Sequence, residues 1–204
     1  MKIQKLLPIP DGPVTIACSG GADSVAAACY LKYEVKANIT LAYVNHGTGY
    51  CLDALRTVQA LAAKLESPMI ILEIDTIVPP KTSKQEHWRN QRYNNLNGLG
   101  SHIILGHQLD DAVESWIFSS LNGTTSLMPY RHGNCVRPFL TVPKSVLREY
   151  AESFDVPIFD CPSNSDLSFR RNYIRHELMP HALVVNPGLR AMIRAKILRR
   201  EFKS

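Results

Sequence analysis

A glycine- and serine-rich segment follows the first strongly apolar run of the chain and precedes an alanine-rich segment. Its eight residues are Ala17, Cys18, Ser19, Gly20, Gly21, Ala22, Asp23 and Ser24. Glycines let backbone N–H groups close around an anion, the two serine hydroxyls add donors, and a helix N-terminus attracts negative charge. The spacing matches neither the GxGxxG dinucleotide motif nor a Walker A loop. It predicts a loop that binds pyrophosphate; the alternative is an ordinary turn capped by Asp23.

Three carboxylates follow the fourth apolar run. Asp110 and Asp111 fall in the first turn of a helix expected to begin near Leu109, and Glu114 follows one turn later. Residues three and four apart share a helix face, so the three carboxylates are predicted to cluster at the sheet edge. Such a cluster suits Mg²⁺, with Asp110 and Asp111 as ligands, or an ammonium group such as the side chain of free lysine. The alternative is acid placement that complements the helix dipole.

Two histidines and three arginines complete the candidate site. His46 and His107 each end an expected strand, where parallel sheets bind ligands, although a structural hydrogen-bonding role is the alternative. Arg171 and Arg175 lie one turn apart on an expected helix. With Arg89 they are candidates to neutralise charge on a phosphoryl group or to grip RNA, and surface ion pairing is the alternative.

Elements that position these residues follow from the hydrophobic pattern. Short β-branched runs, each followed by a segment of helical period, indicate repeated βα units. The expected strands cover residues 14–18, 39–44, 69–74 and 102–106. The expected helices cover residues 23–35, 52–65, 84–96 and 109–121. Parallel strands of this kind are buried on both faces, so we predict an α/β fold with a doubly wound, mainly parallel sheet.

The remaining third of the chain has a different pattern. Residues 122–134 are expected to form a loop, residues 144–154 a helix, and residues 169–179 a further helix that stops before Pro180. No repeat or linker divides the chain, so residues 1–204 are expected to form one catalytic domain. Residues 181–204 are expected to be an appended basic helix that restarts near Pro187.

Composition limits the class of protein. The 204 residues are 45% hydrophobic and 20% charged, which is typical of a globular domain. No apolar run reaches the length of a membrane helix, and no secretory signal is recognisable at the N-terminus, so we expect a cytoplasmic protein with no membrane partner. The five cysteines form no CxxC pair, which argues against a disulfide framework and a metal cage.

The formal net charge of +5 is concentrated at the C-terminus. Residues 181–204 hold six basic residues and one acidic residue, 6 − 1 = +5, whereas residues 1–180 are balanced at 17 of each. The tail is therefore a candidate to contact RNA phosphates, with a solvated helix face as the alternative. The candidate contacts are Arg190, Arg194, Lys196, Arg199 and Arg200.

Five stretches of the chain resemble, in the same order, the signatures of one enzyme family. Residues 19–24 match the SGGxDS signature of the PP-loop ATP pyrophosphatases. Within that group, the chain is similar to the tRNA(Ile)-lysidine synthetase family in residues 44–47, in residues 89–93, in residues 106–115, and in a last signature made of residues 162–164 together with 171–180. It departs from that family at Thr48 and Gly49, at Ala112 and at Cys161, where Leu and Arg, Gln, and Asp are usual.

The resemblance implies a short form of this ligase, without the family's C-terminal domains. ATP and Mg²⁺ would serve to adenylate the wobble cytidine of a CAU anticodon, with release of pyrophosphate, and the amine of free lysine would then displace AMP. The partner would be tRNA, held through its anticodon region. The candidate catalytic residues are Asp23, Arg89, His107, Asp110, Asp111, Glu114, Arg171 and Arg175. ATP would contact residues 17–24 and His46.

Two alternatives remain. One is another PP-loop enzyme acting on tRNA, either a thiolase or a ligase with a different nucleophile; thiolases that handle cytidine usually carry CxxC motifs, and this chain has none. The other is a nucleotide- or RNA-binding homologue that has lost turnover.

Overall fold

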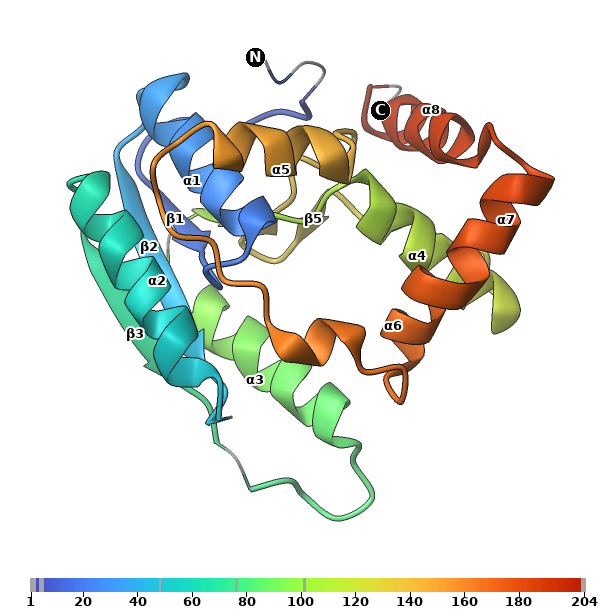
Figure 1. Ribbon diagram of the computed structural model, residues 1–204, viewed down its shortest axis with the longest axis horizontal. Helices are drawn as coiled ribbons and strands as arrows, with labels where there is room; N and C mark the ends of the chain where they lie inside the picture. Colours follow the sequence, from blue (N-terminus) through green and yellow to red (C-terminus); the bar gives the residue numbers. More distant parts are fainter. Residues whose placement is uncertain (1–2, 4–5, 48, 76, 101, 203–204) are drawn as a thin grey trace.

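Six strands form one sheet in the order β3-β2-β1-β4-β6-β5 (Figure 1). The computed structural model describes residues 3, 6–47, 49–75, 77–100 and 102–202. The strands are β1 (Val14–Ala17), β2 (Ile39–Asn45), β3 (Met69–Glu73), β4 (His102–Leu105), β5 (Arg131–His132) and β6 (Cys135–Val136). All neighbouring pairs are parallel except β5 and β6, which are antiparallel. The predicted doubly wound, mainly parallel sheet is confirmed.

Helices cover both faces of the sheet. They are α1 (Ala22–Tyr33), α2 (Cys51–Lys64), α3 (Lys84–Asn97), α4 (Leu109–Leu121) and α5 (Lys144–Glu152). Alternate residues of β2 point to opposite layers: Leu41 and Tyr43 pack with α1, α2 and α5, whereas Ala42 and Val44 pack with α3. The connections between strands therefore change from one face of the sheet to the other between β1 and β4. The carboxyl ends of these two strands are the expected position for a ligand.

The sequence predicted these elements with boundaries at most two residues from those observed. It missed β5 and β6, because two-residue strands carry no readable periodicity. β5 lies inside the loop predicted for residues 122–134. Within the described residues, the structure contains no helix that is both long and apolar enough to cross a membrane.

The predicted stop before Pro180 is wrong. The chain continues from a 3₁₀ turn, η1 (Pro162–Ser165), through α6 (Arg170–Tyr173) and the π-helical η2 (Ile174–Leu178) into α7 (Met179–Val185). Pro180 stands in the first turn of α7, where its missing N–H is tolerated, and the wider π-helical turn precedes it. The proline therefore begins a helix instead of ending one.

The last helix, α8 (Leu189–Phe202), packs into the domain with α4. Ile193 and Ile197 are fully buried in a cluster with residues of α4, η2 and α7. Arg190 pairs with Asp110 of α4, and Arg200 donates to the carbonyls of Leu127 and Met128.

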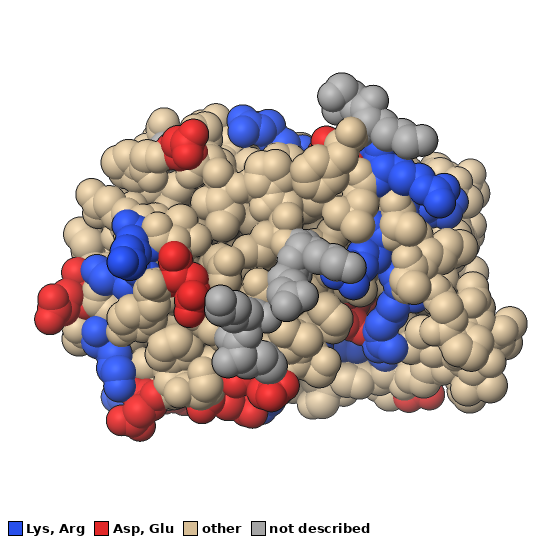
Figure 2. Space-filling model, turned by 90° about the horizontal axis from the view of Figure 1, so that it is seen from above, with Lys and Arg blue, Asp and Glu red and all other residues tan. Residues whose placement is uncertain are grey.

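Basic side chains nonetheless gather on the side of the molecule where α8 lies, as Figure 2 shows. Two of the five predicted RNA contacts, Arg190 and Arg200, are engaged within the protein. Contact with RNA phosphates stays a prediction for Arg194, Lys196 and Arg199.

Gly106 lies where β4 leads toward α4, pressed against the start of α1. A Cβ atom at this position would lie 3.0 Å from the carbonyl oxygen of Asp23 and 3.1 Å from the nitrogen of Ser24. Both are backbone atoms, so they cannot rotate away. We expect Gly106→Ala to lower the free energy of unfolding by about 1–3 kcal/mol, as overpacking does.

Urea unfolding of Gly106→Ala and Gly49→Ala checks this prediction. A Cβ atom at Gly49 meets nothing within 4 Å, so Gly49→Ala is the matched control and should be close to neutral. Equal stability of the two variants would show that the close contact between β4 and α1 is not a constraint.

Candidate active site

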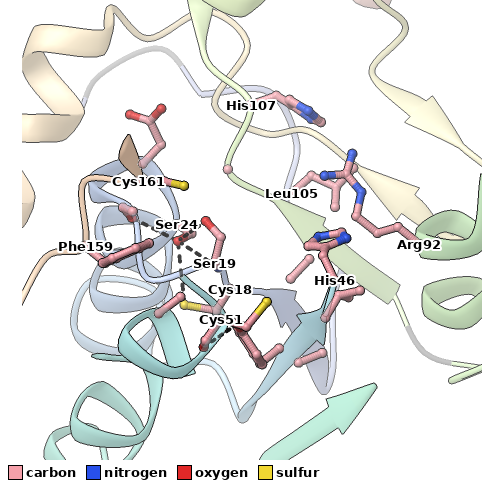
Figure 3. Close-up of a pocket in the computed structure, with 18 of the residues that line it drawn as sticks. Cys18, Ser19, Ser24, His46, Cys51, Arg92, Leu105, His107, Phe159 and Cys161 are labelled. Carbon is pink, nitrogen blue, oxygen red and sulfur yellow. Dashed lines mark hydrogen bonds between the residues drawn. The ribbon is translucent and has the colours of Figure 1, made fainter. Parts of the chain in front are cut away.

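A cavity of about 350 Å³ opens at the carboxyl ends of β1, β2 and β4, where the crossover changes face (Figure 3). Residues from all three strand ends line it, including Cys18, His46 and His107. Phe159 and Cys161 close one side, and Arg92 of α3 lies on the other. The cavity occupies the position at which doubly wound sheets bind ligands.

The glycine-rich loop forms one wall of this cavity, and its two glycines have different roles. Gly20 has φ of +80°, and a Cβ there would lie 3.2–3.3 Å from Thr57 and the carbonyl of Ala54. Gly21 has an ordinary φ of −71° and serves as the N-cap of α1. Gly20 is thus required by the backbone, while Gly21 leaves the N-terminus of α1 open to a ligand.

The two serines of the loop also differ. Ser24 is buried; its hydroxyl donates to the carbonyl of Gly21 at 2.9 Å and accepts from the N–H of Ser19 at 3.2 Å. Ser24 therefore braces the loop, and the exposed Ser19 is the hydroxyl presented to the cavity. Cys18 is buried beneath them, and burial raises the pKa of its thiol. Ala22 is buried in the first turn of α1.

Asp23 brings an unmatched carboxylate to the cavity. Its Oδ1 is buried and has no hydrogen-bond partner among the described residues. Burial, and then the nearby charge of Asp111, raise the pKa of Asp23 to about 7, while Lys144 and Arg175 act in the opposite direction. A buried acceptor of this kind next to a phosphate-type loop suits a cation.

The residues present fit Mg²⁺ held jointly by protein and ligand. Asp23 and Asp111 both line the cavity, and Mg²⁺ commonly takes one or two carboxylates together with phosphate oxygens. Within the described ranges, no three His, Cys, Asp or Glu side chains are grouped closely enough to hold a metal ion themselves. This arrangement makes Asp23 and Asp111 the two candidate carboxylates for a metal bound with phosphates.

The three carboxylates of α4 do not form the single cluster that the sequence predicted. Asp111 and Glu114 share Arg175: its Nε lies 2.6 Å from Glu114 Oε1, and its Nη2 lies 3.2 Å from Asp111 Oδ1. Asp110 turns away and accepts from Arg190 Nε at 2.7 Å and from the N–H of Lys144 at 3.1 Å. Of the predicted metal pair, only Asp111 faces the cavity.

His46 and Arg92 lie next to each other on the side of the cavity opposite Phe159 and Cys161 (Figure 3). His46 Nδ1 and Arg92 Nε are buried without a hydrogen-bond partner among the described residues. Burial, and then the charge of Arg92, lower the pKa of His46, so the imidazole is neutral at pH 7. Arg92 was not among the predicted site residues, although it lies three residues after Arg89 on α3. The predicted departure at Thr48 lies outside the described residues.

His107 is held by a residue that the sequence reasoning missed. Arg137 is 2% exposed; its Nε donates to His107 Nδ1 at 3.2 Å and its Nη2 to the Tyr93 hydroxyl at 2.8 Å. Burial and the surrounding arginines lower the pKa of His107 well below its usual value. Since Nδ1 accepts a hydrogen bond, the neutral ring carries its proton on Nε2. The signal was an arginine inside the apolar run of residues 135–142.

Arg89 and Arg171 do not line the main cavity. They line a smaller cavity of about 160 Å³ on the other side of His107, which borders both. The structure therefore brings together the loop, Asp23, Asp111, His46 and His107. It sets Glu114 and Arg175 behind Asp111, with Asp110 farther away.

Comparison with known proteins identifies the fold and its relatives. Residues 1–182 match the family model described as a PP-loop domain. The chain is 30% identical over 183 residues to a tRNA(Ile)-lysidine synthase of Polaromonas naphthalenivorans, covering 82% of this chain and 56% of the relative. It is 31% identical over 209 residues to one of Porphyromonas gingivalis, covering 95% and 46%. The chain spans about half the length of these curated relatives.

Two solved structures share the fold at low sequence identity. A U34-tRNA thiolase from Methanococcus maripaludis, which carries a 4Fe–4S cluster, aligns with a TM-score of 0.75 at 18% identity. That match covers 94% of this chain and 72% of the thiolase. An NH3-dependent NAD synthetase from Campylobacter jejuni aligns with a TM-score of 0.53 at 19% identity, covering 94% and 86%. At these identities the two structures show a common fold alone.

The raised pKa of Asp23 predicts a pH-dependent cost to the empty protein. The folded protein binds a proton on Asp23 up to about pH 7, whereas the unfolded chain releases it near 3.8. The carboxylate therefore lowers the free energy of unfolding as the pH rises from about 4 to 7. We expect Asp23→Asn to be more stable than the parent protein at pH 8, by at most a few kcal/mol, with the difference vanishing at about pH 4.

Urea unfolding without ligand at a series of pH values checks the Asp23 prediction. Asp53→Asn is the control, because Asp53 is exposed on α2 and its one ion pair with a described residue is with Arg56. If Asp23→Asn and the parent protein had the same free energy of unfolding at pH 8, the ionised Asp23 carboxylate would not destabilise the folded protein, and the prediction would be wrong.

Proposed function

Because the chain belongs to the PP-loop domain family, we propose that it binds ATP at residues 19–24 and uses it to modify tRNA. The observation that carries this proposal is the shared cavity of the glycine loop and the unpartnered Asp23 carboxylate. The N-terminus of α1, the N–H groups of the loop and Ser19 are placed to hold phosphate oxygens. Mg²⁺, where bound, would supply positive charge to the departing pyrophosphate, and Asp23 would hold it together with phosphate oxygens.

We further propose that the reaction is the ligation of lysine to a wobble cytidine of tRNA(Ile) with a CAU anticodon. The sequence relatives named tRNA(Ile)-lysidine synthase support this choice. ATP would adenylate the cytidine O2 with loss of pyrophosphate. The lysine amine would then attack C2 and expel AMP, so one C–N bond forms as the C–O bond breaks.

Asp111 is the carboxylate best placed to receive the lysine ammonium group. It lines the cavity, whereas Glu114 is 4% exposed and lies behind it, bound to Arg175 through both of its oxygens. An incoming ammonium would share Asp111 with Arg175. His107, neutral and donating from Nε2, can hold an acceptor of the substrate at the same cavity wall. The increase in reaction rate would come from positioning the two reactants, the lysine amine and the adenylated cytidine, in one enclosed space.

A sulfur-transfer reaction is the second candidate, because three thiols enter the cavity. Cys18, Cys51 and Cys161 all line it, and the thiolase shares the fold. Burial raises the pKa of Cys18, which makes that thiol a poor nucleophile. Lysine ligation is favoured because the cavity combines carboxylates with the phosphate loop.

Pyrophosphate release tests the proposed function directly. We expect sustained release from ATP and Mg²⁺ only when both lysine and tRNA with a CAU anticodon are present, with lysine incorporated into the tRNA. Without lysine, release should stop once the bound tRNA is adenylated. Turnover that requires a sulfur donor and ignores lysine would establish thiolation instead. Binding of ATP and tRNA without any release would indicate a binding protein that lacks turnover.

Asp111→Asn separates lysine binding from metal binding. Asparagine keeps an oxygen for the N–H of Gln108, which Asp111 caps at 3.0 Å, but it loses the charge that attracts ammonium. We expect the apparent lysine requirement to rise about 10- to 100-fold, the equivalent of one charge-assisted hydrogen bond, with a smaller change for ATP. Steady-state kinetics at varied lysine and ATP measure this, with Asp53→Asn as control. A larger change in the ATP requirement would assign Asp111 to the metal.

A further inference from the structure

The smaller cavity is an arginine-rich space with no acidic wall. Its volume is about 160 Å³, and its polar lining includes Arg89 of α3, Arg137, and Arg171 of α6, with Ser115 and Ser126 beside them. Among the residues that the structure describes, no aspartate or glutamate lines it. A cavity with several guanidinium groups and hydroxyl donors is suited to an oxyanion.

The exposed arginines of this cavity have no direct carboxylate partner among the described residues. Among the described residues, neither Arg89 nor Arg171 forms an ion pair with a carboxylate, and both side chains are exposed to solvent. Enough protein surrounds Arg171 that desolvation, and then the charge of Arg89, lower its pKa, although the charges of Asp111 and Glu114 act in the opposite direction. Two mutually repelling guanidinium groups that remain accessible would gain most from an anion placed between them.

Arg137 provides an independent indication of an anion. It is 2% exposed, yet the three hydrogen bonds that it donates within the described part of the chain all go to neutral acceptors: His107 Nδ1, the carbonyl of Pro129 and the Tyr93 hydroxyl. A buried cation without a counter-charge is costly. The charges of Arg137 and Arg92 also lower the pKa of Tyr93 although burial acts to raise it.

We propose that this smaller cavity binds a backbone phosphate of the RNA substrate, next to the nucleotide whose base enters the main cavity. The inference rests on the proposed function. Its geometric basis is His107, which lines both cavities, so one nucleotide can present its base on one side and its phosphate on the other. Phosphates of ATP would lie at the glycine loop in the main cavity, which leaves the second position for the RNA chain.

Arginine substitution tests this site without relying on turnover. We expect Arg89→Gln and Arg171→Gln each to weaken binding of a CAU anticodon stem-loop RNA about tenfold. Each should also reduce the slope of log K against log salt concentration by about 0.7–0.9. Arg56→Gln is the matched control, because Arg56 is an exposed arginine on α2. Thermal melts confirm that each variant is folded.

A neutral linkage in the RNA locates the phosphate. With a methylphosphonate beside the target cytidine, on its 5′ or 3′ side, we expect the parent protein to lose affinity as the variants do. Arg171→Gln already lacks the arginine, so its affinity for the RNA should fall little further when the neutral linkage replaces the phosphate that Arg171 contacts. If the substitution and the neutral linkage reduced RNA affinity additively at both positions, the inference would be overturned. It would also be overturned if the arginine variants showed a raised lysine requirement, or weaker binding of inorganic pyrophosphate, in place of weaker RNA binding.

The proposed function and the cavity assignment fail in different ways. A parent protein that does not bind the stem-loop RNA overturns both. A parent protein that binds the RNA, with Arg89→Gln and Arg171→Gln indistinguishable from Arg56→Gln, overturns only the phosphate site.

Discussion

Matching buried negative charge at the start of α4 is the constraint on which the rest of this structure depends. Asp110 and Glu114 are 5% and 4% exposed, and an unpaired carboxylate at such depth would cost several kcal/mol. Their cations are Arg190 of α8 and Arg175 of η2. The C-terminal helices therefore dock against α4 through charge as well as through apolar packing, and they support the active site instead of extending away from it.

The same principle explains why Asp23 differs from its neighbours. Arg175 already serves Asp111 and Glu114, so Asp23 is left facing the loop with one oxygen unpartnered. A carboxylate beside a phosphate-binding loop would repel the ligand for which the loop is built. In the proposed function, a divalent cation between them would remove that repulsion, while the unmatched charge costs stability in the empty protein.

The sheet and its helices could be predicted because their periodicity is local, and the loop because glycine and serine spacing is visible in the sequence. Side-chain partners could not, because they depend on where distant segments dock. Nothing near Asp110 in the sequence indicates Arg190, eighty residues away. Arg137 gave a signal, a charge within an apolar run, that pattern reading did not use. Pro180 was misread because a proline that opens a helix resembles one that ends it.

The sign of the charged side chains that line the site changes at His107. The main cavity carries carboxylates that need a cation, whereas the smaller one carries arginines that need an anion. A charged histidine at the boundary would add to the arginine charge and weaken the separation. Arg137 donates to Nδ1, which favours the neutral ring and fixes its orientation. A substrate whose phosphates are spaced along a chain then has one favourable direction of entry, because reversing it would place a phosphate against Asp111 without a cation.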